Sequence, residues 1–318
     1  MKIVIPGGSG QVGTVLARRF QQDGHEVIVL SRKPQRAPWR VVEWDAQSLG
    51  SWATEFEGAD AIINLAGRSV NCRYTDENRR EIMESRVNST RVVGLAIAKA
   101  KEPPRIWLQS STATIYAHRF DAPNDEFHGS LGGDEPDAPA SWRFSIDVAR
   151  SWEQATDEAL TPETRKVKMR SALILSPDRG GIFDTLLSLA RRGLGGSAAG
   201  GRQYISWVHD EDFIRAVYWL MKTEELEGVV NIAAPNPLPQ SEFMRVLREV
   251  WGIRLGLPAT KLMLAVGALF LRTETELILK SRRVISTRLQ QSGFTFQFPT
   301  WIDAARDLCQ KWREMNRK

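Results

Sequence analysis

The chain has 318 residues, of which 42% are hydrophobic and 25% are charged, as expected for one large globular domain with a smaller appendage, or for two domains. Its net charge is +5, but Lys and Arg are scattered among Asp and Glu without a nucleic-acid-binding motif, so we expect no nucleic acid as a partner. The two cysteines, Cys72 and Cys309, lie far apart and in no metal-binding spacing, which excludes a disulfide framework and predicts no metal site.

The sequence also predicts that no membrane partner is involved. The longest apolar stretch, residues 262–271, is about half of what a bilayer crossing requires. We expect no cleavable signal, because the first predicted strand begins at residue 2. These features favour a cytoplasmic protein.

A glycine-rich segment, VIPGGSGQVG at residues 4–13, joins a predicted strand at 2–5 to a predicted helix at 12–20, and a second strand is predicted at 26–30. Glycines between a strand and a helix permit a sharp turn, close approach of the backbone to a pyrophosphate and tight packing of helix on sheet. The first turn of the helix also offers unpaired N–H groups and a positive dipole end to an anion. We therefore predict a dinucleotide-binding turn rather than a purely structural one. Its glycines are Gly7, Gly10 and Gly13.

The residues after the second strand select the cofactor. A protein that prefers NAD usually has an acidic residue here, which accepts hydrogen bonds from the ribose hydroxyls. This chain has Ser31, Arg32 and Lys33 instead. A guanidinium can bind a 2′-phosphate through paired, charge-assisted hydrogen bonds, whereas a carboxylate would repel it. We predict NADP(H), with Arg32 as the main phosphate ligand and Ser31 beside it; the alternative is that Arg32 and Lys33 are solvated loop charges.

Further along the chain, predicted strands alternate with predicted helices, which implies parallel pairing and right-handed crossovers. The further strands are predicted at 40–44, 60–67 (opening into a loop), 105–109, 167–175, 204–208 and 229–233. The further helices are predicted at 48–56, 76–101, 142–160, 212–222 (capped by Asp210), 241–251 and 301–313, and a loop is predicted at 121–139. The predicted fold is therefore α/β, a Rossmann-type doubly wound parallel sheet that binds ligands at the carboxyl ends of its strands.

A change of pattern after Pro177 predicts two parts. Residues 1–176 are predicted to form the NADP-binding Rossmann domain, with part of 202–233 packing back on it. Residues 177–318 are predicted to form a smaller, mainly helical substrate lobe, which includes the tail 236–318.

Three motifs narrow the class of protein: GGSGQVG at 7–13, NLAG at 64–67 and SSTATIY at 110–116. Together they resemble the extended short-chain dehydrogenases, the NAD-dependent epimerase/dehydratase family. Four further stretches resemble the atypical subgroup called epimerase family proteins, or cell-division-inhibitor-like proteins, which carry a C-terminal domain of unknown function. These stretches are Arg73–Thr75, Glu81–Arg86, Ser206–Asp212 and the tail from Asn231 to the terminus. The resemblance covers essentially the whole chain and specifies the family, but it says almost nothing about the substrate.

The resemblance implies a set of cofactor contacts. The three glycines, with the backbone of Gln11 and Val12, would hold the pyrophosphate, and Ser31 and Arg32 would meet the adenosine phosphate. Asp45 would accept a hydrogen bond from the adenine amino group, with a plain helix-cap role as its alternative. The other implied contacts are Leu65, Ala66 and Gly67 along the adenine-side ribose and diphosphate, Glu81 and Arg86 on the long helix, where a solvated face is the alternative, and Ile174 at the nicotinamide side.

The catalytic pair of the family is missing. Short-chain dehydrogenases usually act through Tyr-x-x-x-Lys on a helix, where the lysine lowers the pKa of the tyrosine and a nearby Ser or Thr hydroxyl holds the substrate oxygen. Here Phe144 takes the tyrosine position and Val148 the lysine position, so any proton must come from elsewhere. The candidate catalytic residues are Ser111 and Thr112, for polarising a carbonyl, and Tyr116, for donating a proton. His209 is a second candidate donor, with a structural hydrogen bond as its alternative role.

Two functions follow from these residues. The first is an NADP(H)-binding oxidoreductase or epimerase-like enzyme with a degenerate active site, acting on an unknown small molecule. The second is a catalytically silent NADP(H)-binding regulator or scaffold. Arg202, Tyr204 and Trp207 are predicted near the substrate and favour a flat or anionic molecule. The usual dimer of the superfamily would use the helices at 76–101 and 142–160 to form a homodimer.

Overall fold

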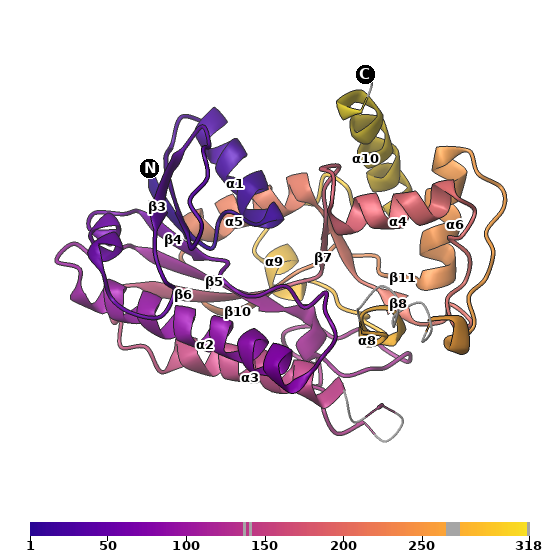
Figure 1. Cartoon of the computed structure of the whole chain (residues 1–318), viewed down its shortest axis with the longest axis horizontal. Helices are drawn as coiled ribbons and strands as arrows, with labels where there is room; N and C mark the ends of the chain where they lie inside the picture. The colour runs from indigo at the N-terminus through magenta and orange to yellow at the C-terminus, as the bar shows by residue number, and fades with distance from the viewer. Residues whose placement is uncertain (136–137, 140–141, 265–273, 317–318) are drawn as a thin grey trace.

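The computed structural model describes residues 1–135, 138–139, 142–264 and 274–316. A seven-stranded sheet lies at its centre, with the strand order β10-β6-β5-β4-β1-β2-β3 and parallel pairing throughout (Figure 1). Its strands are β1 (Lys2–Pro6), β2 (Glu26–Ser31), β3 (Arg40–Glu43), β4 (Ala61–Asn64), β5 (Ile106–Thr112), β6 (Arg165–Ser171) and β10 (Gly228–Ile232). The predicted doubly wound α/β fold is confirmed.

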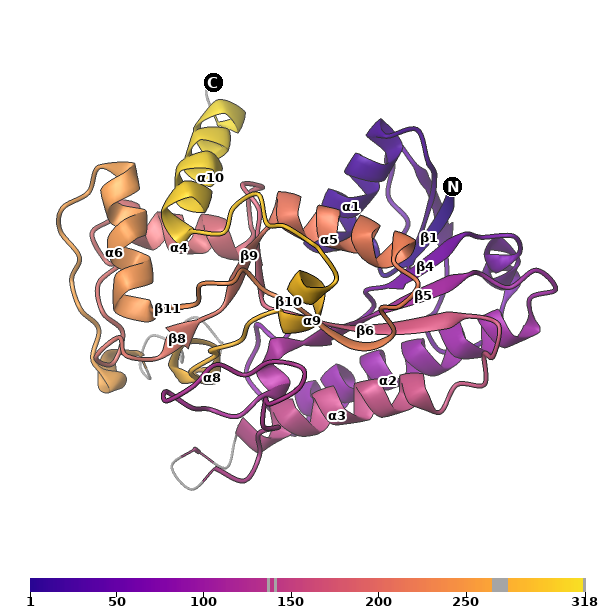
Figure 2. The same cartoon turned by 180° about the vertical axis from the view of Figure 1, so that it is seen from behind.

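Helices cover both faces of the sheet, so its strands must be apolar on both sides. Successive residues of a strand point to opposite faces: Ile3 and Ile5 belong to one buried apolar cluster, and Val4 belongs to another. The two views agree that α1 and α5 lie on one face and α2 and α3 on the other (Figures 1 and 2). These helices are α1 (Gln11–Gln22), α2 (Asp76–Lys99), α3 (Arg143–Asp157) and α5 (Asp210–Lys222).

A second group of helices forms a smaller lobe beside the carboxyl end of the sheet (Figure 2). Its core contains Phe243 and Trp301, whose rings stack with centroids 3.9 Å apart, and the Trp301 indole N–H donates to the Phe243 carbonyl over 2.8 Å. Besides the four helices that cover the main sheet, the structure describes α4 (Ile182–Arg191), α6 (Gln240–Trp251), α8 (Glu276–Leu279), α9 (Thr287–Gln291) and α10 (Trp301–Met315). Two short strand pairs join this lobe to the sheet: β7 (Leu173–Leu175) with β9 (Trp207–His209), and β8 (Tyr204–Ile205) with β11 (Leu238–Pro239).

The structure divides two of the predicted strands. The strand predicted at 167–175 breaks at Ala172, whose N–H turns to the carbonyl of Ile232, and β7 then leaves the main sheet to pair with β9. The strand predicted at 204–208 likewise becomes β8 and β9. Periodicity cannot reveal such breaks, because the apolar pattern continues across them.

Two local predictions are corrected. The helix predicted at 48–56 is a 3₁₀-helix, Ser51–Phe56, because a turn closed by the Asp45 carboxylate precedes it. The helix predicted to be capped by Asp210 is capped by His209, whose Nδ1 accepts the Glu211 N–H over 3.1 Å. Of the apolar stretch at 262–271, residues 265–271 lie outside the described residues, as do 136–137 of the predicted loop.

Candidate functional site

The glycine-rich turn between β1 and α1 packs directly against the end of β4. Gly7 has a φ of +74°, and a Cβ at this position would lie 2.5 Å from the Cα of Ala66. The Leu65 N–H donates to the Pro6 carbonyl over 2.8 Å, which fixes the two segments together. The structure therefore brings the predicted residues Gly7, Leu65 and Ala66 into one cradle, and only glycine fits at position 7.

The N-terminus of α1 faces open space beside this cradle. A Cβ at Gly13 would lie 2.4 Å from the Cα of Gly8, so this glycine permits close packing of helix on turn. At Gly10 the nearest atom to such a Cβ is 3.8 Å away, and no side chain caps the helix here. The N–H groups of Gln11 and Val12 thus begin a helix whose open end can accept an anion.

The Gln11 side chain carries a buried polar atom without a partner. Its Nε2 makes no hydrogen bond, although it is shielded from solvent. A Cβ at Gly181 would lie only 1.9 Å from it, so the loop between β7 and α4 packs closely against the Gln11 side chain. An unsatisfied amide donor costs free energy unless a ligand accepts its hydrogen bond, and a phosphate oxygen is a suitable acceptor.

The end of β2 presents a free guanidinium beside the turn. The Ser31 hydroxyl is buried and hydrogen-bonds to the Ser9 hydroxyl over 3.1 Å and to the N–H of Lys33 over 3.2 Å. Arg32 is exposed and takes part in none of the salt bridges within the described ranges. Ser31 therefore shapes the loop, while Arg32 is available to a phosphate group.

The Asp45 carboxylate is already hydrogen-bonded within its own loop. Its carboxylate accepts the N–H groups of Gln47 and Ser48, each over 2.9 Å. A hydrogen bond from the Ser48 hydroxyl, together with these N–H groups, lowers the pKa of Asp45. The Asp45 carboxylate therefore closes a turn and does not cap a helix, since the N-cap of the following 3₁₀-helix is Gly50. The adenine contact stays a prediction.

Arg86 lies directly beneath Gly67. A Cβ at Gly67 would lie 3.2 Å from the Arg86 Cγ and Cζ, and the guanidinium lies 5.0 Å from the ring centroid of Trp152. Burial lowers the pKa of Arg86 to about 10. Glu81 does not pair with Arg86 but forms an ion pair with Arg68.

The third strand-end segment is the end of β5. The Ser111 hydroxyl is buried and donates to Glu153 Oε1 over 2.6 Å, and Glu153 also accepts two hydrogen bonds from Arg170, each over 2.7 Å. Thr112 is only half-buried, and its Oγ1 accepts the Thr114 N–H over 3.1 Å, which leaves its own hydroxyl proton free. Of the two predicted hydroxyls, Thr112 is therefore the one available to a substrate.

Tyr116 lies in a buried network. It is 2% exposed, its hydroxyl donates to Asn231 Oδ1 over 2.9 Å, and the Arg170 guanidinium lies 5.0 Å from its ring centroid. Burial raises the pKa of Tyr116 despite the nearby Arg170. This geometry joins β5 to β10 and does not suit proton donation to a substrate.

The other residues predicted near the substrate or nicotinamide divide between the core and the surface. His209 is fully buried, with Nε2 2.9 Å from Asp307 Oδ2, which matches its structural alternative. Trp207 is also fully buried, against Trp301. Tyr204 is half-buried below the Arg283 guanidinium, Arg202 is exposed beside Phe120, and Ile174 packs against the core shared by α1 and α5.

Tyr74 is a half-buried tyrosine that contacts Phe144, the residue at the position of the family tyrosine. The ring of Tyr74, in the loop between β4 and α2, meets that of Phe144 edge-on, with centroids 5.2 Å apart. The Arg79 guanidinium lies 5.0 Å from the Phe144 ring centroid. Sequence reasoning used the Arg73–Thr75 stretch only to recognise the subgroup and assigned Tyr74 no role.

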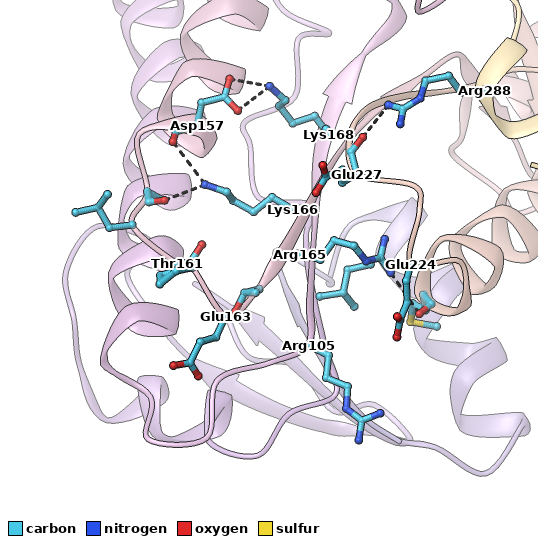
Figure 3. A pocket seen from close by; sticks show the side chains of 17 residues that line it. Arg105, Asp157, Thr161, Glu163, Arg165, Lys166, Lys168, Glu224, Glu227 and Arg288 are labelled. Atoms are coloured by element: carbon cyan, nitrogen blue, oxygen red, sulfur yellow. Dashed lines mark hydrogen bonds and ion pairs between the residues drawn. The ribbon is translucent and has the colours of Figure 1, made fainter.

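A cavity of about 1150 Å³ lies at the opposite end of the sheet (Figure 3). It is lined by residues at the amino ends of β5, β6 and β10, and two of its cations are already bound: Lys168 pairs with Asp157 over 2.7 Å, and Lys166 donates to backbone carbonyls. Ligands of doubly wound sheets bind at the carboxyl ends, so the volume of this cavity does not make it the functional site.

Two further observations concern metal ions and membranes. Within the described ranges, no group of three or more His, Cys, Asp or Glu side chains could hold a metal ion. In the same residues, no helix is long and apolar enough to cross a membrane.

The parallel sheet, the glycine cradle and the open N-terminus of α1 define an NAD(P)-binding Rossmann fold. The chain belongs to the NAD-dependent epimerase/dehydratase family, whose model matches residues 3–233, and a domain of unknown function, DUF1731, matches residues 261–308. The predicted family is confirmed.

Relatives match over nearly the whole length. The human epimerase family protein SDR39U1 is 31% identical over 97% of this chain and 99% of its own, and YfhF of Bacillus subtilis is 29% identical over 94% of both. The crystal structure of human SDR39U1 (isoform 2) with NADPH superposes with a TM-score of 0.84 at 28% identity, covering 98% of this chain and 99% of that one.

Proposed function

We propose that this protein binds NADP(H) at the carboxyl edge of β1, β2 and β4 and uses it to oxidise, reduce or epimerise a small molecule. The single observation that carries this proposal is the cradle at Gly7, where a side chain would collide with Ala66. Because the backbone of the glycine turn lies this close to the end of β4, a diphosphate can approach the backbone in front of the turn. The human relative that was crystallised with NADPH supports the same cofactor.

The residues at this edge of the sheet fit NADP(H). The open end of α1 and the unpaired Nε2 of Gln11 would bind the diphosphate oxygens. Arg32 would bind the 2′-phosphate, because it is exposed and unpaired where an NAD-binding protein would have a carboxylate. When bound, the cofactor supplies or accepts a hydride, and the half-buried Thr112 would orient the substrate oxygen by donating a hydrogen bond to it.

The second candidate function is a catalytically silent NADP(H)-binding regulator or scaffold. Its supporting observation is the replacement of the family pair by Phe144 and Val148, which cannot move a proton. One measurement distinguishes the two functions: whether a panel of aldehydes and ketones oxidises NADPH in the presence of the protein. Binding without oxidation across the panel favours the regulator.

Calorimetric titration with NADPH and NADH tests the cofactor site. For Arg32→Ala we expect NADPH binding to weaken roughly tenfold to a hundredfold, since a hydrogen bond to a charged group contributes about 1.5–3 kcal/mol, with little change for NADH. Arg36→Ala is the matched control, because Arg36 is an exposed arginine in the same loop. Failure of the wild-type chain to bind either dinucleotide would overturn the proposal.

A further inference from the structure

Two loops of the smaller lobe run side by side at its outer edge, where Figures 1 and 2 show the chain that follows α6. The Leu257 N–H donates to the Gly193 carbonyl over 2.7 Å, and the Gly196 N–H donates to the Leu257 carbonyl over 3.2 Å. A Cβ at Gly196 would lie 2.4 Å from the Leu257 carbonyl oxygen, so glycine permits this close approach. The two loops, residues 193–199 and 253–264, therefore form one surface, which we call the apolar face.

Large apolar side chains of both loops are exposed on this face. They are Leu194, Leu255, Leu257, Leu262 and Met263, and each is at least half exposed. A Cβ at Gly193 would lie 3.6 Å from the Leu255 Cδ2, so the Leu255 side chain reaches the other loop. Single exposed leucines are ordinary on a globular protein, whereas neighbouring ones mark a surface that meets a protein or a membrane.

Cations accompany these apolar side chains. Arg192, Arg254 and Lys261 are exposed, and none of them forms a salt bridge within the part of the chain that the structure describes. The sequence stretches that contain the two loops, residues 185–209 and 250–273, include no Asp or Glu. The two loops therefore combine exposed apolar groups with positive charge that they do not neutralise themselves.

The neighbouring helices add to this positive charge. On α6, the carboxylates of Glu242 and Glu249 are both paired with Arg245. At the end of α6, the guanidiniums of Arg191 and Arg313 lie 5.3 and 4.1 Å from the ring centroid of Trp251. The charge around the apolar face is thus positive, and a surface that covers it should be negative.

An anionic membrane surface suits this combination better than a second copy of the chain. A symmetric dimer through the apolar face would bring Arg192, Arg254 and Lys261 of the two copies together, and like charges repel. Anionic lipid headgroups attract such cations, and the acyl region accepts exposed leucine and methionine side chains.

We propose that the apolar face docks on the surface of a bilayer that contains anionic lipids, with its leucines in the outer acyl region and its cations among the headgroups. The protein would then lie on the membrane and not span it. The prediction of no membrane partner came from the length of the apolar stretch at 262–271, which concerns only a spanning segment. The inference does not rest on the proposed function, because the apolar face shares no residue with the proposed cofactor site.

Co-sedimentation of the full chain with vesicles tests this inference. The probes are vesicles of mixed phosphatidylcholine and phosphatidylglycerol and vesicles of phosphatidylcholine alone. We expect the chain to bind the mixed vesicles at least roughly tenfold more tightly and to be released from them as salt is added, because salt screens the charges. Absence of binding to the mixed vesicles overturns the proposal, and so does equal binding to the two kinds.

Two double variants separate the apolar and charged contributions. Leu255→Gln/Leu257→Gln should weaken binding to the mixed vesicles by at least roughly tenfold, because two leucines no longer enter the acyl region. Arg254→Gln/Lys261→Gln should weaken it by roughly tenfold to thirtyfold, since each cation near an anionic surface contributes several-fold.

The matched control is Leu160→Gln. Leu160 is also strongly exposed, but it lines the cavity at the amino ends of the strands, away from the apolar face. This variant should bind the mixed vesicles as the wild type does. Wild-type binding by either double variant, or an equal loss in Leu160→Gln, overturns the proposal.

Sedimentation velocity without vesicles tests whether a second copy covers the face instead. We expect Leu255→Gln/Leu257→Gln to leave the oligomeric state of the chain unchanged. A wild-type dimer that this variant converts to a monomer would assign the apolar face to a partner copy and overturn the membrane inference.

Discussion

Gly7 and Ala66 approach so closely that a Cβ on the glycine would lie 2.5 Å from the Cα of the alanine. Gly7 also has a φ of +74°, a conformation that costs other residues about 1–2 kcal/mol. We therefore predict that Gly7→Ala lowers the free energy of unfolding by at least about 2 kcal/mol, because the clash adds to the strain. Urea denaturation followed by circular dichroism measures this change.

Gly10→Ala is the control for this prediction. Its φ is −74°, and a Cβ would meet nothing closer than 3.8 Å, so the folded chain should tolerate it within about 0.5 kcal/mol. The methyl group would nevertheless occupy space in front of the helix N-terminus, so NADPH binding should weaken. If Gly10→Ala binds NADPH as the wild type does, the diphosphate does not lie where we propose.

A second prediction concerns the buried ion pair between Glu153 and Arg170. Both side chains are only 9% exposed, and removing one charge would leave the other buried and unpaired. We predict that Glu153→Gln lowers the free energy of unfolding by about 3–5 kcal/mol. Chemical denaturation measures this, and the double variant Glu153→Leu/Arg170→Met, which removes both charges, should recover much of the loss.

The sequence predicted the sheet and the cradle well because both depend on local patterns. Buried parallel strands are short apolar runs, and the turn at Gly7 needs its glycines within seven residues. The role of Arg32 likewise depends only on its position after β2. These features could be predicted without knowing which distant segments touch.

The catalytic side could not be predicted in this way, because its contacts join distant segments. Ser111 is engaged by Glu153, 42 residues further along the chain, and the Ser145 hydroxyl on α3 donates to Glu276, 131 residues after it. No spacing rule connects such residues.

A third prediction separates the two hydroxyls at the end of β5. Ser111→Ala should lower the free energy of unfolding by about 1 kcal/mol, since it removes a buried hydrogen bond to Glu153. Thr112→Ala should also lower the free energy of unfolding by about 1 kcal/mol, since its Oγ1 accepts the Thr114 N–H. Only this variant should lower kcat for carbonyl reduction, by roughly 10²-fold, because a donor to the substrate oxygen is lost. Denaturation and initial-rate measurements on both variants check this, and the opposite pattern would make Ser111 the substrate ligand.

The last prediction concerns pH and the contact between α5 and α10. Burial lowers the pKa of His209, but hydrogen bonds to Asp210 and Asp307 outweigh it, so the pKa is raised in the folded chain. A folded pKa above the unfolded value of about 6.5 means that protonated His209 stabilises the fold below that pH. This contribution is lost as the pH rises from about 6.5 through the raised folded pKa.

His209→Asn therefore should cost more stability at pH 6 than at pH 9, because only the charged imidazole attracts both carboxylates, although its Nδ1 then no longer accepts the Glu211 N–H. Thermal unfolding of both chains across this range measures the difference, with Asp307→Asn as a second variant that removes one carboxylate and should reduce the same pH dependence. Stacking of His209 on Phe298, at 3.9 Å between centroids, does not depend on an attraction to these carboxylates. A stability difference that is constant with pH would mean that packing of this kind, and not charge, holds the two helices together.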